Sequence, residues 1–215
     1  MFINKIITEL KLELLKDLPS NKAHQRMMPK NRILVSYDDI TTEIPKLSSV
    51  LILLYPKNNQ LFTVFIKRQE YEGVHSGQIA FPGGKYEEKD INLINTALRE
   101  GNEEIGIDVS AIEILGKLSE LFIPRSNFMV LPVIGYTPVP QLFTINHKEV
   151  NKVIEVSLEE LLSPNNISEN EFIVIGNKKI IAPCYVFGNH KVWGATAMIV
   201  SELIEVLKAS DKSVI

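Results

Sequence analysis

The chain has one cysteine, Cys184, among 215 residues. An intrachain disulfide and a metal site built from several cysteines are therefore both excluded. So little cysteine suits the reducing interior of a cell, and a cytoplasmic location is the expectation.

Long apolar runs are also missing, since none approaches the roughly 18 residues that a membrane-spanning helix needs. The first residues, 1–19, do not resemble a secretory signal, because Lys and Glu interrupt the apolar residues every two or three positions. They fit an amphipathic helix that ends near Pro19. This helix is expected to pack on its own domain, with a membrane-surface contact or a homodimer contact as the alternatives.

An excess of positive charge is absent as well. The 23 basic and 26 acidic residues give a net charge of −3, and the basic residues are scattered along the chain. There is no electrostatic reason to expect a nucleic acid as partner. With 45% hydrophobic and 23% charged residues, the composition is that of an ordinary soluble protein.

The chain shows no internal repeat and no low-complexity segment, and one domain is favoured. We expect an N-terminal helix and connection over 1–46, the main domain over 47–207 and a tail over 208–215. Within the first part, the polar segment 18–46 is expected to cross the surface.

Strand-like and helix-like segments alternate irregularly along the main domain. A hairpin is expected from 49–55 and 61–68, joined by residues 56–59. Further strands are expected at 112–119, 129–136, 172–176 and 180–187, and helices at about 92–104, 158–162 and 194–207. Gly106 is well placed as the C′ residue that ends the first of these helices. This order predicts an α/β or α+β fold with a mixed sheet covered by helices.

The most informative stretch is 81–107, where a glycine turn and a short acidic loop precede an amphipathic helix. Glu100, Glu103 and Glu104 lie together near the C-terminal end of that helix. Like charges at this spacing repel and oppose the helix dipole, at a cost of roughly a few tenths of a kcal/mol each. Such a cluster suits a hard divalent cation such as Mg²⁺. A solvated acidic face is the alternative.

Arg99 sits beside this cluster, and its guanidinium can bind a carboxylate through two parallel hydrogen bonds. Asp90, at the end of the acidic loop, is the expected partner. The pair would hold the loop against the helix.

The segment resembles the Nudix box, with Gly84, Arg99 and Gly106 in register and Glu100, Glu103, Glu104 and Ile107 also matching. It departs from that pattern in three places. Asp90 stands where the pattern has Glu, and one extra residue separates Asp90 from Arg99. Gly101 replaces a hydrophobic residue and is expected to weaken the helix by about 1 kcal/mol relative to Ala.

The extra residue is familiar from the coenzyme A diphosphatase branch of the Nudix enzymes, whose upstream signature residues 65–84 also resemble. Arg68, Gly77, Phe81, Pro82, Gly83 and Gly84 fall in register, but Gly73 stands where a second arginine is expected. Segments 121–136, 149–162 and 192–203 look similar to this branch too. The resemblance covers about 48–205.

This resemblance implies a Nudix-type α/β/α sandwich with a mixed sheet. It also implies a metal-dependent hydrolase that cleaves the diphosphate of coenzyme A, or of its derivatives, into adenosine 3′,5′-bisphosphate and 4′-phosphopantetheine. The alternatives are a Nudix hydrolase acting on ADP-ribose, NADH or a nucleotide sugar, and a non-catalytic binding module with this fold.

The resemblance also assigns roles to residues. The implied catalytic residues are Arg99, Glu100, Glu103 and Glu104; the implied ligands of Mg²⁺ or Mn²⁺ are Glu100, Glu103, Glu104 and Gly84; and the implied substrate contacts are Arg68, Gly77, Phe81 and Gly83. The proton acceptor is left open among Glu100, Glu103 and Glu149, the last of which also fits an exposed charge before a strand. Trp193 and Tyr185 are candidates for stacking on a base, with packing as the commoner role.

Overall fold

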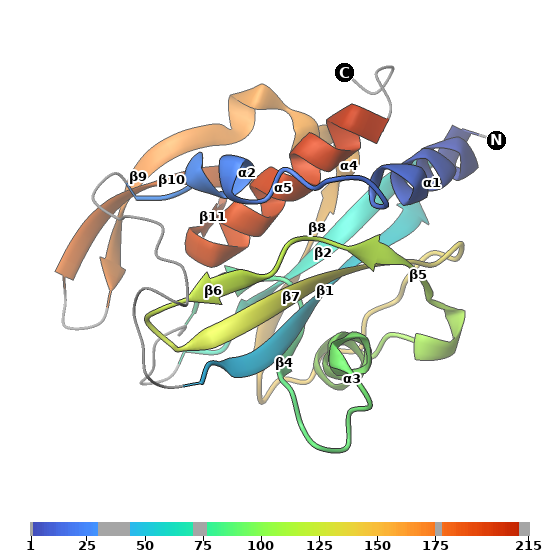
Figure 1. Cartoon of the computed structure of the whole chain (residues 1–215), viewed down its shortest axis with the longest axis horizontal. Coiled ribbons are helices and arrows are strands. Elements are labelled where there is room, and N and C mark those ends of the chain that lie inside the picture. The colour runs from blue at the N-terminus through green and yellow to red at the C-terminus, as the bar shows by residue number, and fades with distance from the viewer. Residues whose placement is uncertain (1, 30–43, 71–76, 175–177, 211–215) are drawn as a thin grey trace.

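Two strands that run side by side in the same direction form the centre of the larger sheet (Figure 1). The computed structural model describes residues 2–29, 44–70, 77–174 and 178–210. Its helices are α1 (Phe2–Glu13), α2 (Asn21–Gln25), α3 (Leu93–Ile105), α4 (Leu158–Leu162) and α5 (Gly194–Ser210), with 3₁₀ turns at Val109–Ala111 and Pro164–Asn166. Its strands are β1 (Lys46–Lys57), β2 (Gln60–Arg68), β3 (Ile79–Ala80), β4 (Gly83–Lys85), β5 (Glu113–Lys117), β6 (Leu121–Ile123), β7 (Phe128–Tyr136), β8 (Val150–Ser157), β9 (Ile167–Val174), β10 (Lys178–Phe187) and β11 (His190–Trp193).

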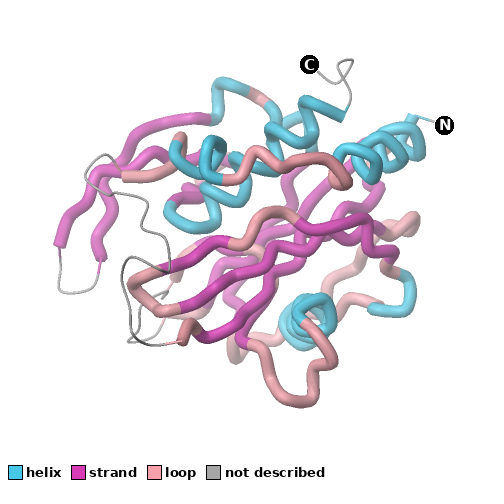
Figure 2. Tube along the Cα trace, viewed as in Figure 1, coloured by secondary structure: helices cyan, strands magenta, loops and turns pink. Residues whose placement is uncertain are grey.

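The larger sheet is mixed, as expected from the sequence. Strands β1 and β7 are parallel, and the remaining pairings are antiparallel. Strand β1 pairs with both β2 and β4, which brings the glycine turn of β4 to the middle of the sheet. A second antiparallel sheet has the order β11-β10-β9, and Figure 2 shows its strands projecting beside helix α5.

Helices cover both faces of the larger sheet. Successive side chains of β1 point to opposite faces, so Ile52 and Leu54 join one core cluster and Leu51 and Leu53 join another. The first cluster lies under α1 and α5 and the second under α3, on the other side of the sheet (Figure 1). The fold is therefore the expected α/β/α sandwich.

The expected hairpin is confirmed, with a two-residue turn at Asn58 and Asn59. Their φ values of 51° and 62° belong to the mirror-image turn that matches the twist of paired strands. The expected strand at 172–176 begins earlier, at Ile167, and residues 175–176 lie outside the described residues. The strand expected after Glu149 is β8. Strands β4, β6 and β11 were not expected; they have only three or four residues and form through pairing with neighbouring strands.

The N-terminal segment corrects two expectations. Helix α1 ends at Glu13 rather than near Pro19. Residues 18–29 are not an irregular connection over the surface, because they contain α2, which packs on α5, and Ala23, His24 and Met27 are buried. The rest of the expected connection, residues 30–43, lies outside the described residues.

A buried polar contact explains why α2 is held there. The side chain of Glu202 on α5 is inaccessible to solvent, and its carboxylate lies 3.0 Å from His24 Nε2. It also accepts hydrogen bonds from the Ser20 amide and from the Ser119 hydroxyl. These partners compensate the buried charge and hold its pKa below the ordinary value despite burial. No helix among the described residues is long and apolar enough to cross a membrane.

Candidate active site

Helix α3 is fixed at both ends by short-range contacts. Asn92 precedes it and accepts hydrogen bonds from the amides of Ile94 and Asn95 at 2.9 and 3.1 Å. At the other end Gly106 has a φ of 69° and donates to the Asn102 carbonyl. This left-handed conformation favours glycine, as the sequence predicted. The carboxylates in the last turns are therefore held at fixed positions.

Strand β4 runs unusually close to both β1 and helix α3. A Cβ atom on Gly83 would come within 2.6 Å of the Val50 Cα and would overlap the Ser49 carbonyl. A Cβ atom on Gly84 would come within 2.5 Å of the Glu100 carboxyl carbon. Only residues without side chains fit here, so the glycine pair lets the strand contact the helix carboxylates directly.

Glu104 is the most buried carboxylate of the group, with 1% of its surface exposed. It accepts a 2.8 Å hydrogen bond from the Gly83 amide, and Arg68 Nη1 lies 3.9 Å away. Burial raises the pKa of Glu104 to about 7, and Glu100 and Glu149 add to the rise, while Arg68 and the Gly83 amide oppose it. Arg68 and the Gly83 amide therefore do not fully compensate the negative charge of an ionised Glu104.

Three carboxylates converge at this point. Glu100, Glu104 and Glu149 each offer an oxygen, and these oxygens lie within 4.8 Å of one another. Burial also raises the pKa of Glu100. Oxygen ligands grouped around a shared point, with more negative charge than their neighbours neutralise, fit a hard divalent cation.

Arg99 organises the acidic loop beside the same helix. Its Nε and Nη2 atoms donate to the two oxygens of Asp90 at 2.8 and 2.9 Å, which confirms the expected pair. Its Nη1 atom donates to Glu100 and Glu103 at 2.9 Å each. The guanidinium holds the pKa of Asp90 far below its usual range. Arg99 therefore fixes the acidic loop and orients Glu100.

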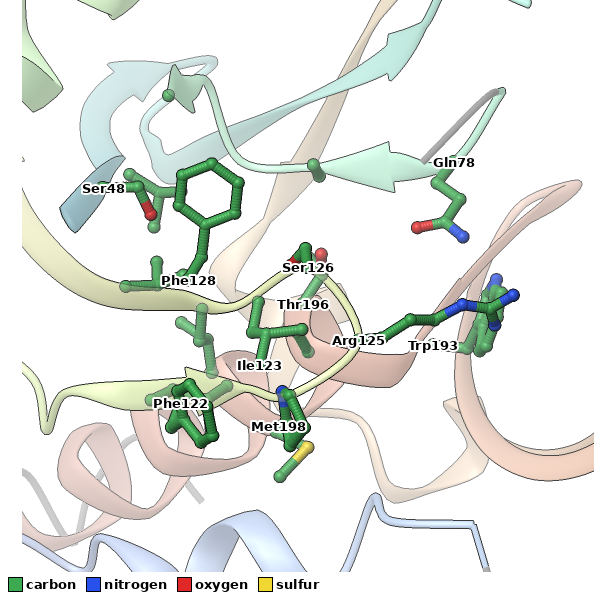
Figure 3. Close-up of a pocket in the computed structure, with 18 of the residues that line it drawn as sticks. Ser48, Gln78, Phe122, Ile123, Arg125, Ser126, Phe128, Trp193, Thr196 and Met198 are labelled. Atoms are coloured by element: carbon green, nitrogen blue, oxygen red, sulfur yellow. The ribbon is translucent and has the colours of Figure 1, made fainter. Parts of the chain in front are cut away.

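A large cavity adjoins the carboxylates and has a volume of about 1240 Å³. Arg68, Gly83 and Gly84 belong to its wall and also contact the carboxylate group. The rest of the wall comes mainly from β1, β3, β4, β6, β7, β9, β10, β11 and α5 and from the turn between β6 and β7, and Figure 3 shows side chains of the lining residues around the space.

The cavity wall is mostly apolar, with several cations. Its apolar members include Phe122, Ile123, Phe128, Ile180, Met198 and Ile199. Arg68, Lys85, Arg125 and Lys179 supply positive charge, and Glu169 supplies a carboxylate. A long molecule with both anionic and apolar parts would match this lining.

Comparison with known proteins gives the family. The family model described as "NUDIX domain" matches residues 45–174. The protein named "Uncharacterized Nudix hydrolase NudL" from Yersinia pestis (strain Pestoides F) is 36% identical over 156 residues, which is 72% of this chain and 75% of the relative. The protein of the same name from Yersinia pseudotuberculosis serotype O:1b (strain IP 31758) matches to the same extent.

The chain belongs to the Nudix hydrolase family. Among solved structures, the MutT protein from Methanosarcina mazei Go1 has 18% sequence identity and a TM-score of 0.48. That match covers 77% of this chain and 96% of the other.

The Nudix residues expected from sequence occupy different surroundings. Arg68, Gly83 and Gly84 line the cavity. Glu103 faces Arg99 and Lys89 with 45% of its side chain exposed, and it is not one of the three converging carboxylates. Its assignment as a ligand stays a prediction.

Two expected substrate contacts lie elsewhere. Phe81 is 1% exposed and stacks on Phe65 with 4.5 Å between ring centroids, so its visible role is core packing. Gly77 adopts a φ of 64° and donates to the Gln69 carbonyl. Neither residue is part of the described cavity wall, and direct contact with a substrate stays a prediction for both. Gly73 lies outside the described residues.

Some residues of this Nudix site had weak or no signals in the sequence. Glu149 is an exposed charge directly before β8, as one interpretation of the sequence had it, and the pairing of β8 with β2 also brings its carboxylate to Glu104. Lys85 and Arg125 were not singled out. The available signals were the position of Lys85 directly after the glycine pair and the position of Arg125 in the turn after Pro124.

Proposed function

We propose that this Nudix hydrolase cleaves the diphosphate of coenzyme A, or of its derivatives, into adenosine 3′,5′-bisphosphate and 4′-phosphopantetheine. The proposal rests on one observation, which is that the same residues line the cavity and contact the carboxylates. Arg68, Gly83 and Gly84 stand in the upstream segment that resembles the coenzyme A branch, and they both line the cavity and lie against Glu100 or Glu104. The segment that suggests the substrate thus lies where the substrate would bind.

The size and lining of the cavity support a substrate of this kind. Pockets for small ligands commonly span about 300–1,000 Å³, so a cavity of 1240 Å³ has room for more than one mononucleotide. Coenzyme A combines a phosphorylated nucleotide with a long pantetheine arm. The cations and the apolar surface of this cavity match those two parts.

We assign the metal site to Glu100, Glu104 and Glu149, with the Gly84 backbone and Glu103 as further candidates. Mg²⁺ or Mn²⁺ bound there would neutralise diphosphate charge and lower the pKa of an attacking water. Water adds to one phosphorus, the bridging P–O bond breaks, and each product keeps one of the two phosphates of the former diphosphate; the nucleotide product keeps its 3′-phosphate as well.

The chain's own cations position the other groups. Arg68 donates a 2.8 Å hydrogen bond to the Gly83 carbonyl, which holds its guanidinium beside the carboxylate group. From there it can also donate to a phosphate. Arg99 acts through Glu100 and Asp90 rather than on the substrate. Its role is to keep the acidic loop and the first carboxylate in place.

Product analysis tests the proposal. Purified protein is incubated with coenzyme A, ADP-ribose or NADH, each with Mg²⁺ or Mn²⁺, and the products are resolved by ion-exchange chromatography. We expect adenosine 3′,5′-bisphosphate and 4′-phosphopantetheine in equal amounts from coenzyme A. Turnover of ADP-ribose without turnover of coenzyme A would replace the proposed substrate, and turnover of none would favour a binding module.

A further inference from the structure

Arg125 is a cation in the cavity wall whose charge nothing described neutralises. It occupies the turn between β6 and β7 and is exposed. Among the described residues its guanidinium makes no hydrogen bond and no ion pair. Lys179, in the same wall, is by contrast paired with Glu171 at 2.9 Å. Arg125 is therefore available to an anionic ligand.

The turn that carries Arg125 is fixed to the sheet. The Ser126 amide donates to the Ile123 carbonyl at 3.2 Å, and the Asn127 amide donates to the Pro124 carbonyl at 3.3 Å. The Asn127 carbonyl accepts a 2.8 Å hydrogen bond from the Lys46 amide at the start of β1. The backbone under Arg125 is thus anchored, which lowers the entropic cost of using its side chain for binding.

The surroundings of Arg125 differ from the rest of the cavity. In Figure 3 its side chain extends toward Trp193, with Gln78 at the same end of the view, while Phe122 and Phe128 lie at the other end. One face of Trp193 stacks on Phe172, with 4.5 Å between centroids and 14° between planes. An aromatic ring held in place in the same cavity wall as a free guanidinium that points toward it suits a base and a phosphate of one ligand.

We propose that Arg125 and Trp193 form a subsite for a nucleotide bearing a phosphate monoester on its ribose, with Arg125 binding that monoester. This inference rests on the proposed function, because it assumes that the diphosphate itself lies at Glu104 and Arg68. Arg68 already serves that position, so Arg125 is left for a second anionic group. The apolar end of the cavity then receives the arm on the other side of the diphosphate.

Binding of two nucleotides that differ by one phosphate tests the subsite without turnover. Trp193 is the chain's one tryptophan, so its fluorescence reports on this end of the cavity. We expect adenosine 3′,5′-bisphosphate to bind at least about tenfold more tightly than AMP, as a charge-assisted hydrogen bond to a phosphate provides. Arg125→Ala should remove this difference, and Arg125→Lys should keep part of it.

A matched control and a kinetic comparison complete the test. Lys117 on β5 is exposed and outside the described cavity wall, so Lys117→Ala should leave both affinities unchanged. With coenzyme A and its 3′-dephospho form as substrates, Arg125→Ala should raise KM for the first by about tenfold and leave the second within about twofold.

The outcomes separate this inference from the proposed function. Equal affinity of the wild-type protein for the two nucleotides overturns the subsite, and so does an equal loss of both in Arg125→Ala. Selective binding of the bisphosphate without hydrolysis of coenzyme A supports the subsite and overturns the proposed substrate.

Discussion

Helix α3 carries carboxylates on two sides that differ in how their charge is compensated. On one side Arg99 binds Asp90 through two hydrogen bonds and also donates to Glu103. On the other side Glu104 is buried beside Glu100 and Glu149, and its nearest cation, Arg68, stands 3.9 Å away. Glu100 belongs to both groups, because Arg99 Nη1 also donates to it at 2.9 Å. The two acidic groups at helix α3 thus differ in role: the one bound by Arg99 holds the loop in place, and the one around Glu104 is the group to which we assign a cation.

Replacing Glu104 should have the largest effect, because it removes the central carboxylate of the uncompensated side. We predict that Glu104→Gln lowers kcat by about a hundredfold or more, the order of loss when one group that stabilises transition-state charge is removed. Steady-state kinetics with saturating Mg²⁺ measure it, and circular dichroism checks the fold. Activity within about threefold of wild type would remove Glu104 from the metal site.

Breaking the compensated side should cost stability instead. Asp90 is 4% exposed and Arg99 keeps 14% of its side chain exposed, so Asp90→Asn removes the buried negative charge that Arg99 binds through two hydrogen bonds, although Arg99 keeps Glu100 and Glu103 as partners. We predict a loss of about 2–3 kcal/mol in the free energy of unfolding, measured by urea denaturation. Glu87→Gln is the control, since Glu87 is half exposed and 3.9 Å from Arg99. An equal loss in both variants would argue against the special role of Asp90.

The two sides should also differ in their response to pH. The pKa of Glu104 is raised to about 7 from an ordinary value of 4.5, so between these values the native protein holds a proton that the unfolded chain has released. The contribution of Glu104 to the stability of the metal-free protein should be fullest below about pH 4.5 and fall by about 3 kcal/mol as the pH rises through 7, whereas the contribution of Asp90, whose pKa is lowered, is lost only in acid.

Thermal unfolding at several pH values measures this fall, with metal removed by a chelator. Saturating Mg²⁺ should flatten the profile, because the cation compensates the ionised carboxylate. Glu104→Gln should flatten it without metal. A profile in Glu104→Gln as steep as in wild type would assign the fall to other groups.

The smallest effect is expected at Glu103, which resembles Glu104 in the Nudix box but contacts Arg99 and Lys89 at the surface. We predict that Glu103→Gln lowers kcat by less than about tenfold and changes stability by about 0.5 kcal/mol or less. Parallel assays with Glu104→Gln give the comparison. A loss equal to that of Glu104→Gln would return Glu103 to the ligand set and blur the distinction between the two sides.

The sequence predicted contacts between residues that are close in the chain better than contacts between distant ones. The ends of α3, the left-handed Gly106 and the Asp90–Arg99 pair depend on residues within about a dozen positions, and the sequence predicted all of them. Glu149 joins Glu104 only because β8 pairs with β2, and the β4 turn contacts the helix only because β4 pairs with β1. Such long-range pairings decide which charges meet, and spacing along the chain does not record them.

Gly101 shows the same limit in one residue. From sequence it is a helix-weakening departure from the Nudix pattern. In the fold, an added Cβ would come within 2.7 Å of the Ile107 side chain and 3.1 Å of Leu51. The missing side chain thus allows α3 to approach the sheet closely, and that benefit depends on neighbours that the helical pattern does not identify.

The segment matched by the family model and the segment that buries the core have different lengths. The match spans 45–174, yet Leu10 of α1 and Leu203 of α5 fill the same core cluster as Ile52. A protein trimmed to the matched residues would lose one whole layer of the sandwich and expose a continuous apolar sheet face, which favours aggregation. The catalytic signature is thus shorter than the unit that folds, so the flanking helices belong in any expressed version of this enzyme.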